Sequence, residues 1–296
     1  MFCCASTGPS WNSLQPANSK QHHMARLLNT KPSQGLTIAL GTAPFLAVAT
    51  VYAIASAERL LVNARDNLLP SLQSMFAGLE RVGFVTDPVS GHLVFLTDTL
   101  ASLERLGIGL GIAAAIGLII GLAVGLIPIA RATLAPFISV LSIIPPITLL
   151  PILFIAFGLG DVSKIILIVI GITPFIARDI ASRTQEIPEE MLIKAQTLYG
   201  STWLITLHVV LPQIFPRLLE SIRLSLGPAW LFVLSGEAIA AQSGLGYRIF
   251  LVRRYMAMDV IIPYVIWIGI LAFTLDLALR WGAKRLSPWS QPGNTR

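Results

Sequence analysis

Long apolar runs alternate with short polar connections along most of this chain. A hydrocarbon core about 30 Å thick needs roughly 20 apolar residues in helical form. Six stretches approach or exceed that length: 36–57, 106–130, 134–159, 162–177, 224–241 and 260–279. The pattern therefore predicts an all-α polytopic membrane protein with about six transmembrane helices.

Composition supports a membrane protein. Of the 296 residues, 54% are hydrophobic and 12% are charged, whereas soluble domains carry about 25% charged residues. The net charge of +6 fits basic residues gathered at span ends, and no basic run interleaved with aromatics indicates nucleic-acid binding. The two cysteines, Cys3 and Cys4, are adjacent, and the histidines are scattered, so we expect no metal site and no cofactor.

The distribution of Lys and Arg predicts the orientation. More of them fall on the side shared with both termini, which places the termini in the cytoplasm; the main exception is the cluster of Arg248, Arg253 and Arg254. We expect a cytoplasmic tail over 1–35, in which 1–23 is disordered or an extension upstream of Met24. A transmembrane domain over 36–285 contains a cytoplasmic loop over 179–217, and a second tail covers 286–296.

The second span carries a small residue at every fourth position. These residues are Gly109, Ala113, Gly117, Gly121 and Gly125. A stripe of this kind lets another helix approach closely in lipid. Packing within the chain is favoured over a seam between two copies.

The third span is rich in proline, and each proline removes a backbone donor. The carbonyls that this frees at membrane depth must face protein or a water-filled cavity. The span is therefore interpreted as lining a path for solute, or equally as a kink buried among other helices. The path candidates in this span are Ser139, Ser142, Pro145 and Pro146.

Ionisable residues inside spans are costly and are functional candidates by default. Glu237, beside Ser235 in the fifth span, is a further path candidate together with that serine; the alternative is pairing at the outer helix end, with Arg248 as partner. Asp276 and Arg280 have the spacing of an intrahelical pair. Glu220 and Arg223 are expected to pair locally, and Lys164 is expected to extend toward the membrane surface.

The cytoplasmic loop has the pattern of two short helices. Pro188, Glu189 and Glu190 suit a helix start, and an apolar face follows. Gly200 interrupts this helix, and a second one runs toward Pro212. We expect this helical hairpin to dock into a groove on a soluble partner.

The same loop resembles that of the permease subunits of binding-protein-dependent ABC importers. Their pattern is Glu-Ala-Ala, three residues, Gly, nine residues, an aliphatic residue, one residue, and Leu-Pro. Aligned on Leu-Pro, this chain places no glutamate in the first position, keeps one of the two alanines, and has its glycine one position late. The docking residues that the resemblance implies are Ile193, Lys194, Ala195, Leu198, Tyr199, Gly200, Val209, Leu211 and Pro212.

Other segments resemble the nitrate, sulfonate and taurine branch of these permeases, with some similarity to a sub-branch associated with urea and guanidine. They are Leu69-Pro70-Ser71, T-L-A-S-L-E-R at 99–105, the Gly-rich second span, Pro145-Pro146 through Phe157-Gly158, and Gly244-Leu245-Gly246-Tyr247.

The resemblance implies a type I ABC importer permease fold in a bacterial inner membrane. Two permease copies, surrounded by lipid, would form a central path, two ATPase subunits would dock on the loops, and an extracytoplasmic binding protein would deliver a small polar solute. The sequence contains no G-x-x-x-x-G-K-[ST] phosphate loop, so we expect this subunit not to be an enzyme. The alternative is an ATPase-independent secondary transporter or channel, whose typical inverted repeats are not apparent.

Overall fold

The computed structural model describes residues 33–62, 68–86, 91, 93–199 and 201–286. The chain divides into two units, Met1–Ile54 and Ala55–Arg296, which are described separately. The cysteine pair, most of both predicted tails, and Gly200 lie outside the described residues.

The first unit contains most of helix α1, Gln34–Val62. Its side chains from 34 to 51 are all exposed, and they are predominantly apolar. An apolar helix without a buried face is typical of a segment whose neighbours are lipid.

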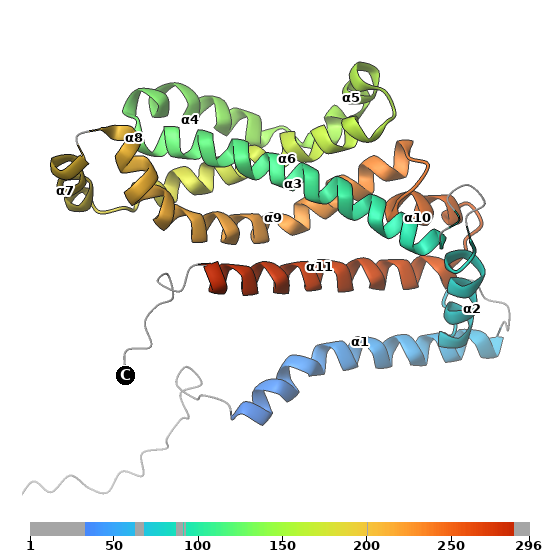
Figure 1. Cartoon of the computed structure of the whole chain (residues 1–296). Helices are drawn as coiled ribbons and strands as arrows, with labels where there is room; N and C mark the ends of the chain where they lie inside the picture. The colour runs from blue at the N-terminus through green and yellow to red at the C-terminus, as the bar shows by residue number, and fades with distance from the viewer. Residues whose placement is uncertain (1–32, 63–67, 87–90, 92, 200, 287–296) are drawn as a thin grey trace, which may run out of the picture. The chain divides into compact units, whose positions relative to one another are not determined.

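Two parallel helices form the centre of the second unit: α3, Val94–Leu126, and α6, Asp161–Gln185 (Figure 1). Gly117 lies against Ile176, and a Cβ atom at this glycine would come within 2.8 Å of the isoleucine Cγ2. Gly109, Gly121 and Gly125 face Ile168, Ile180 and Thr184 with the same sequence offset. The small-residue stripe therefore packs within the chain, as predicted.

The third span is broken. Helix α4, Pro128–Ile143, is followed by the 3-10 turn η2, Pro146–Leu149, and by α5, Leu150–Phe157, and the two halves are bent by 83°. The break falls at Pro145-Pro146, where two consecutive backbone donors are missing. Within the described part of the chain, five helices are long and apolar enough to cross a membrane, and this bent pair makes a sixth.

The fifth span begins earlier than its hydropathy predicts. After α7, Glu189–Tyr199, the chain enters α8, Thr202–Ile205, a π-helical turn at Thr206–Val210, and α9, Leu211–Ala240. These form one candidate span, Thr202–Ala240. The second helix of the predicted hairpin thus continues through Pro212. The π turn ends at Val210, two residues before this proline, whose missing N–H would interrupt a regular helix.

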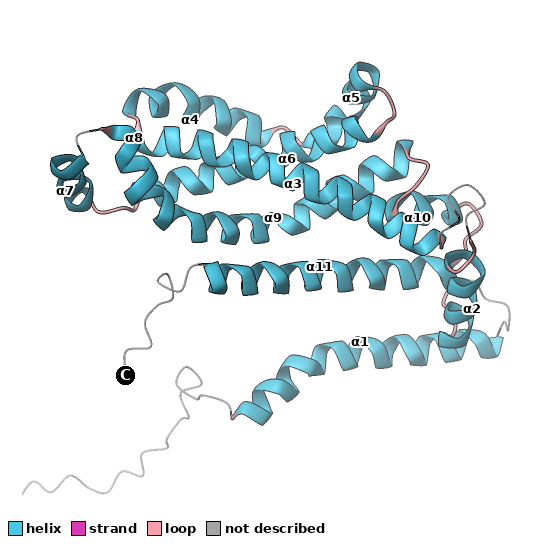
Figure 2. Cartoon of the chain, in the orientation of Figure 1, coloured by secondary structure: helices cyan, strands magenta, loops and turns pink. Residues whose placement is uncertain are grey.

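Three further helices complete the second unit: α2, Leu72–Gly83, α10, Leu245–Arg253, and α11, Met258–Leu286. The Ser71 hydroxyl caps α2, as the sequence of that segment favours. Helix, shown in cyan, accounts for most of the described residues (Figure 2), which also contain an isolated bridge between Thr86 and Leu93.

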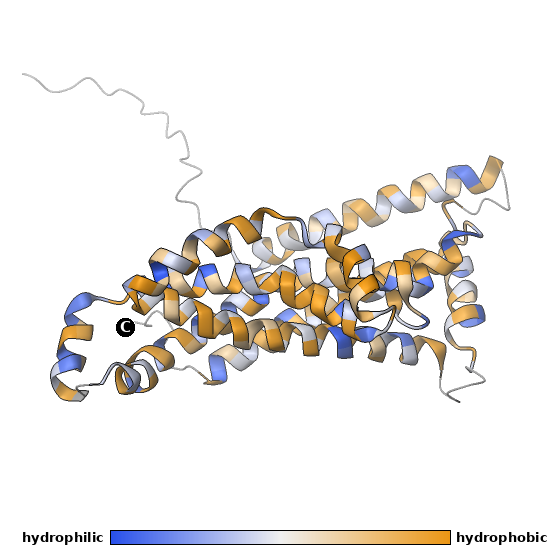
Figure 3. Cartoon of the chain, turned by 90° about the horizontal axis from the view of Figure 1, so that it is seen from above, coloured by the Kyte–Doolittle hydropathy of each residue, from blue (hydrophilic) through white to orange (hydrophobic). Residues whose placement is uncertain are grey.

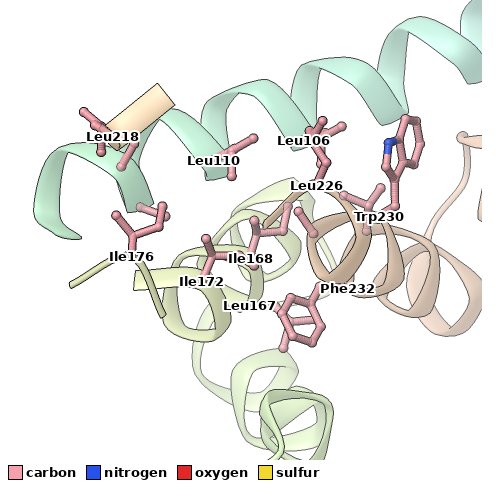
Figure 4. Close-up of a cluster of buried hydrophobic side chains, with 14 of the residues drawn as sticks. Leu106, Leu110, Leu167, Ile168, Ile172, Ile176, Leu218, Leu226, Trp230 and Phe232 are labelled. Carbon is pink, nitrogen blue, oxygen red and sulfur yellow. The ribbon is translucent and has the colours of Figure 1, made fainter. Parts of the chain in front are cut away.

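The core lies where α3, α6 and α9 meet. Leu106 and Leu110 of α3 face Ile168 and Ile172 of α6, and Trp230 joins them from α9 (Figure 4). The spans carry long hydrophobic stretches, whereas α7 mixes hydrophobic and hydrophilic residues (Figure 3). This composition separates the membrane helices from the helix predicted to face water.

Candidate functional site

A pocket of about 550 Å³ lies between the broken third span, α6 and α9. Two of the predicted path residues, Ser142 and Pro146, line it, and Ser225 joins them from α9. The Ser142 hydroxyl donates to the Ile138 carbonyl over 2.7 Å. The break in the third span therefore opens onto a cavity.

Arg178 is the residue of this pocket that the sequence interpretation missed. The fourth span was expected to end at Ala177, but α6 continues to Gln185, so Arg178 lies within a helix. Its guanidinium has no ion pair or hydrogen bond among the described residues, whereas the neighbouring Asp179 pairs with Arg183 at 3.6 Å. The sequence between 178 and 185 contains no glycine or proline, which could have indicated that the helix continues past Ala177.

A smaller pocket of about 330 Å³ shares Arg178 with the first and includes the predicted path residue Ser139. Pro145 is exposed and lines neither of these two pockets. Three of the four predicted path residues of the third span therefore line one or the other of two neighbouring cavities.

Glu237 lies elsewhere, in a fully buried junction. The Nη1 atom of Arg105 lies 2.6 Å from its Oε1, the hydroxyl of Ser102 lies 2.8 Å from the same oxygen, and the backbone N–H of Gly246 donates to its Oε2. The expectation of a paired carboxylate at the end of this helix is met, but Arg248 is the wrong partner. Ser235 is half-buried, and it lines neither of the two pockets described above.

Arg248 pairs instead with Asp98, over 2.7 Å between Nε and Oδ2. Although burial lowers the pKa of this guanidinium, the hydrogen bond and the charge of Asp98 raise the pKa above its ordinary value. Asp98 also accepts from the backbone N–H of Gly244. The pair therefore fixes the start of α10 against α3.

Other predicted pairs have mixed outcomes. Asp276 and Arg280 pair at 2.9 Å, as expected. The expected pair of Glu220 and Arg223 is wrong, because Arg223 contacts Asp276 of α11 at 2.8 Å and Glu220 contacts Arg217 at 3.5 Å. Lys164 does not extend to the surface either: it is buried at the start of α6.

The predicted docking residues fall on α7 and on the start of the fifth span. Ile193 and Leu198 are 58% and 79% exposed, although both are apolar. Ala195 is buried, and Lys194 is exposed. Nothing is described of Gly200, and Tyr199 is the last residue of α7.

The remaining docking residues lie in the π turn or directly after it: Val209 and Leu211 are half-buried and Pro212 is exposed. The amide of Gln213 donates to the Val209 carbonyl over 2.9 Å and lies 3.1 Å from the sulfur of Met191. Gln213 therefore connects α7 to the start of the fifth span.

Comparisons with known proteins agree with this architecture. Residues 107–291 match the family described as the binding-protein-dependent transport system inner membrane component. The taurine transport system permease TauC of Escherichia coli K12 is 31% identical over 92% of this chain and 96% of its own length. The nitrate import permease NrtB of Synechococcus elongatus is 30% identical over 65% of this chain and 70% of its own.

Among solved structures, a chain of the MetNI methionine ABC transporter in an inward-facing conformation is similar in fold. The TM-score is 0.58 at 22% identity, covering 68% of this chain and 99% of that one. The predicted type I importer fold is therefore confirmed. The chain belongs to the inner membrane components of binding-protein-dependent transport systems, and it is a permease subunit of an ABC importer from the branch that includes nitrate, sulfonate and taurine permeases.

Proposed function

We propose that this permease subunit carries a small oxyanion across the bacterial inner membrane, as one of two copies that together enclose the path. The relatives support an anion: besides taurine and nitrate permeases, they include permeases named for aliphatic sulfonates and for bicarbonate. These solutes share a compact anionic group that exposes oxygen atoms.

The observation that carries the proposal is Arg178, which lines the pocket of about 550 Å³ and pairs with no residue in the described part of the chain. A guanidinium offers several N–H donors in a plane and binds oxyanions in a two-point geometry. The hydroxyls of Ser142 and Ser225 line the same cavity and supply neutral donors. Asp179 lines the same pocket, but its carboxylate pairs with Arg183. The charge of Arg178 therefore repels a guanidine-like cation, and a neutral urea-like solute would not neutralise it, so an anion fits best.

We also propose that α7 receives the ATPase subunit. Its exposed Ile193 and Leu198 are covered by no other part of the described chain, and helix-in-groove binding uses apolar residues of this kind. Helix α7 lies toward the same end of the second unit as the end of α11 (Figure 1). With an even number of spans, we expect both termini on the side of the ATPase.

The test is uptake by liposomes that contain the full chain with its ATPase, supplied with the binding protein and its solute. Mass spectrometry of the solute that co-purifies with the binding protein identifies the substrate class. We expect a small oxyanion, and ATP-dependent uptake that Arg178→Met lowers by about tenfold or more, because one charge-assisted contact is lost. Arg217→Met is the matched control, because Arg217 is on α9 and neither it nor its partner Glu220 lines the first pocket.

Three results would overturn the proposal. Uptake by the chain without an ATPase would indicate a secondary transporter or channel. A cationic or neutral solute would exclude the anion assignment. Equal uptake by Arg178→Met and wild type, at equal membrane abundance, would remove Arg178 from the path.

A further inference from the structure

A third pocket, of about 580 Å³, lies at the N-terminal end of α6, far from Arg178. Two cations line it, Arg105 of α3 and Lys164 of α6, together with the carboxylate of Asp161 and the chain at 240–243. At a rise of 1.5 Å per residue, Lys164 and Arg178 are about 21 Å apart along α6. The two cationic pockets are therefore separate places.

Lys164 is poorly satisfied for a buried ammonium group. The residue is 2% exposed. Its Nζ lies 3.3 Å from the Leu159 carbonyl and 3.4 Å from Oδ1 of Asp161, and the third N–H has no acceptor among the described residues. Both contacts are long for a charged donor, for which about 2.8 Å is usual. A buried ammonium group with two long contacts and one N–H without an acceptor in the described chain favours a further anionic partner.

The charges around the pocket balance only while Asp161 stays on the two cations. Glu237 neutralises Arg105 from the protein side, at 2.6 Å, and does not line the cavity. On the cavity side, a single oxygen of Asp161 serves both Arg105, at 2.9 Å, and Lys164, at 3.4 Å. The side chain of Asp161 is 60% exposed, so water competes for this carboxylate and it can rotate away.

The backbone adds positive potential at the same place. Helix α6 is 25 residues long and begins at Asp161, and the residue before it, Gly160, provides no side-chain cap. The first N–H groups of a helix carry partial positive charge and suit an anion. They lie beside the two buried cations, because Gly160 and Asp161 line the same pocket.

We propose that this pocket is a second binding site for a small oxyanion, in which the anion takes the place of the Asp161 carboxylate on Lys164. When no anion is bound, the Asp161 carboxylate contacts Arg105 and Lys164 and so competes with the anion for them. This goes beyond the proposed function, since it concerns the other end of α6, and anion binding here does not require uptake.

The test is sulfate binding to the full-length chain in lipid nanodiscs, measured as the rise in unfolding temperature with sulfate at constant ionic strength. All proteins carry Arg178→Met, so that the first pocket does not contribute. We expect saturable stabilisation, and Lys164→Met should raise the half-saturating sulfate concentration by about tenfold or more. Asp161→Asn should lower this concentration severalfold, because the competing charge is gone.

The opposite directions of the two variants separate ligand binding from a structural role. If Asp161 only holds Arg105 and Lys164 in place, Asp161→Asn will weaken or leave unchanged the response to sulfate, and the proposal is wrong. An unchanged response in Lys164→Met also overturns it. Should Lys164→Met fail to fold, Asp161→Asn decides alone, since its side chain is largely exposed.

Discussion

Arg105 of α3 donates to Glu237 of α9 over 2.6 Å, although 132 residues separate them in sequence. Both side chains are almost completely buried, at 6% and 0% exposure. An ionised carboxylate can occupy this position because Arg105, Ser102 and the Gly246 amide all donate to it. The junction joins α3, α9 and α10 at the end of the second unit away from α7.

Glu237→Gln should therefore act first on stability. It leaves the Arg105 guanidinium buried without this counter-ion, and breaking a buried pair costs about 3 kcal/mol. We expect a lower unfolding temperature in detergent and reduced membrane abundance. The double variant Arg105→Gln/Glu237→Gln should lose less than the sum of the two single variants.

Asp259→Asn is the control, because its partner Arg81 is 69% exposed and such pairs contribute about 1 kcal/mol or less. If Glu237→Gln matched the wild type in stability and abundance while uptake fell, Glu237 would return to the solute path.

The stripe of small residues on α3 supports a second prediction. A Cβ atom at Gly121 would lie 2.7 Å from Cβ of Ile180 and 2.9 Å from the Ala177 carbonyl oxygen, so that α3 and α6 must separate. Gly121→Ala should destabilise the protein by about 1–3 kcal/mol, as overpacking does. Thermal unfolding of the purified protein measures this.

Gly111 provides the comparison on the same helix, since nothing lies within 4 Å of a Cβ added there. Gly111→Ala should be neutral or slightly stabilising, because alanine favours helix. Equal effects of the two substitutions would mean that α3 and α6 do not pack as described.

Hydropathy predicted the number of spans but not their ends. Helix α3 begins at Val94, well before the expected start at 106, because the charged residues that interrupt the apolar run are neutralised in the fold. Asp98 pairs with Arg248, and Arg105 with Glu237 and Asp161. A span predicted from hydropathy ends at such charges, because the average does not include the distant residues that neutralise them.

The candidate site shows the same limit. Spacing along a helix found the pair of Asp276 and Arg280, and the prolines located the break in the third span beside a cavity. Arg223 was assigned to its local neighbour Glu220, although its partner is on another helix. Arg178 was missed because the fourth span was ended one residue too early, and its lack of a partner among the described residues is visible only in the folded chain.

The contact between Arg223 and Asp276 leads to a third prediction. Asp276 accepts from Arg223 of α9 at 2.8 Å and from Arg280 at 2.9 Å, so its carboxylate joins α9 to α11. Asp276→Asn should lower stability by about 1–2 kcal/mol, whereas Glu220→Gln, which loses a pair at 3.5 Å, should change it by less than about 0.5 kcal/mol. Thermal unfolding in one detergent measures both variants. A larger loss of stability for Glu220→Gln than for Asp276→Asn would favour the local pair of Glu220 and Arg223.

The last prediction concerns α7. Leu198 is 79% exposed and contributes little to the packing of its own chain. If α7 enters a groove of the ATPase, Leu198→Glu places a charge in an apolar contact and should lower ATP-dependent uptake by about tenfold or more, while insertion and abundance stay unchanged. Uptake and ATP hydrolysis by the reconstituted importer, measured together, show whether the two have become uncoupled.

A pair of alanine variants, Leu198→Ala and Leu277→Ala, provides the matched control. Alanine is used because glutamate at position 277 would place a charge in lipid. Both remove an exposed leucine side chain, and Leu277, on α11, is 54% exposed within a span. Only Leu198→Ala should weaken retention of the ATPase during purification, because only α7 is expected to touch it. If the two variants retain the ATPase equally well and Leu198→Glu transports normally, the docking surface lies elsewhere than on this face of α7.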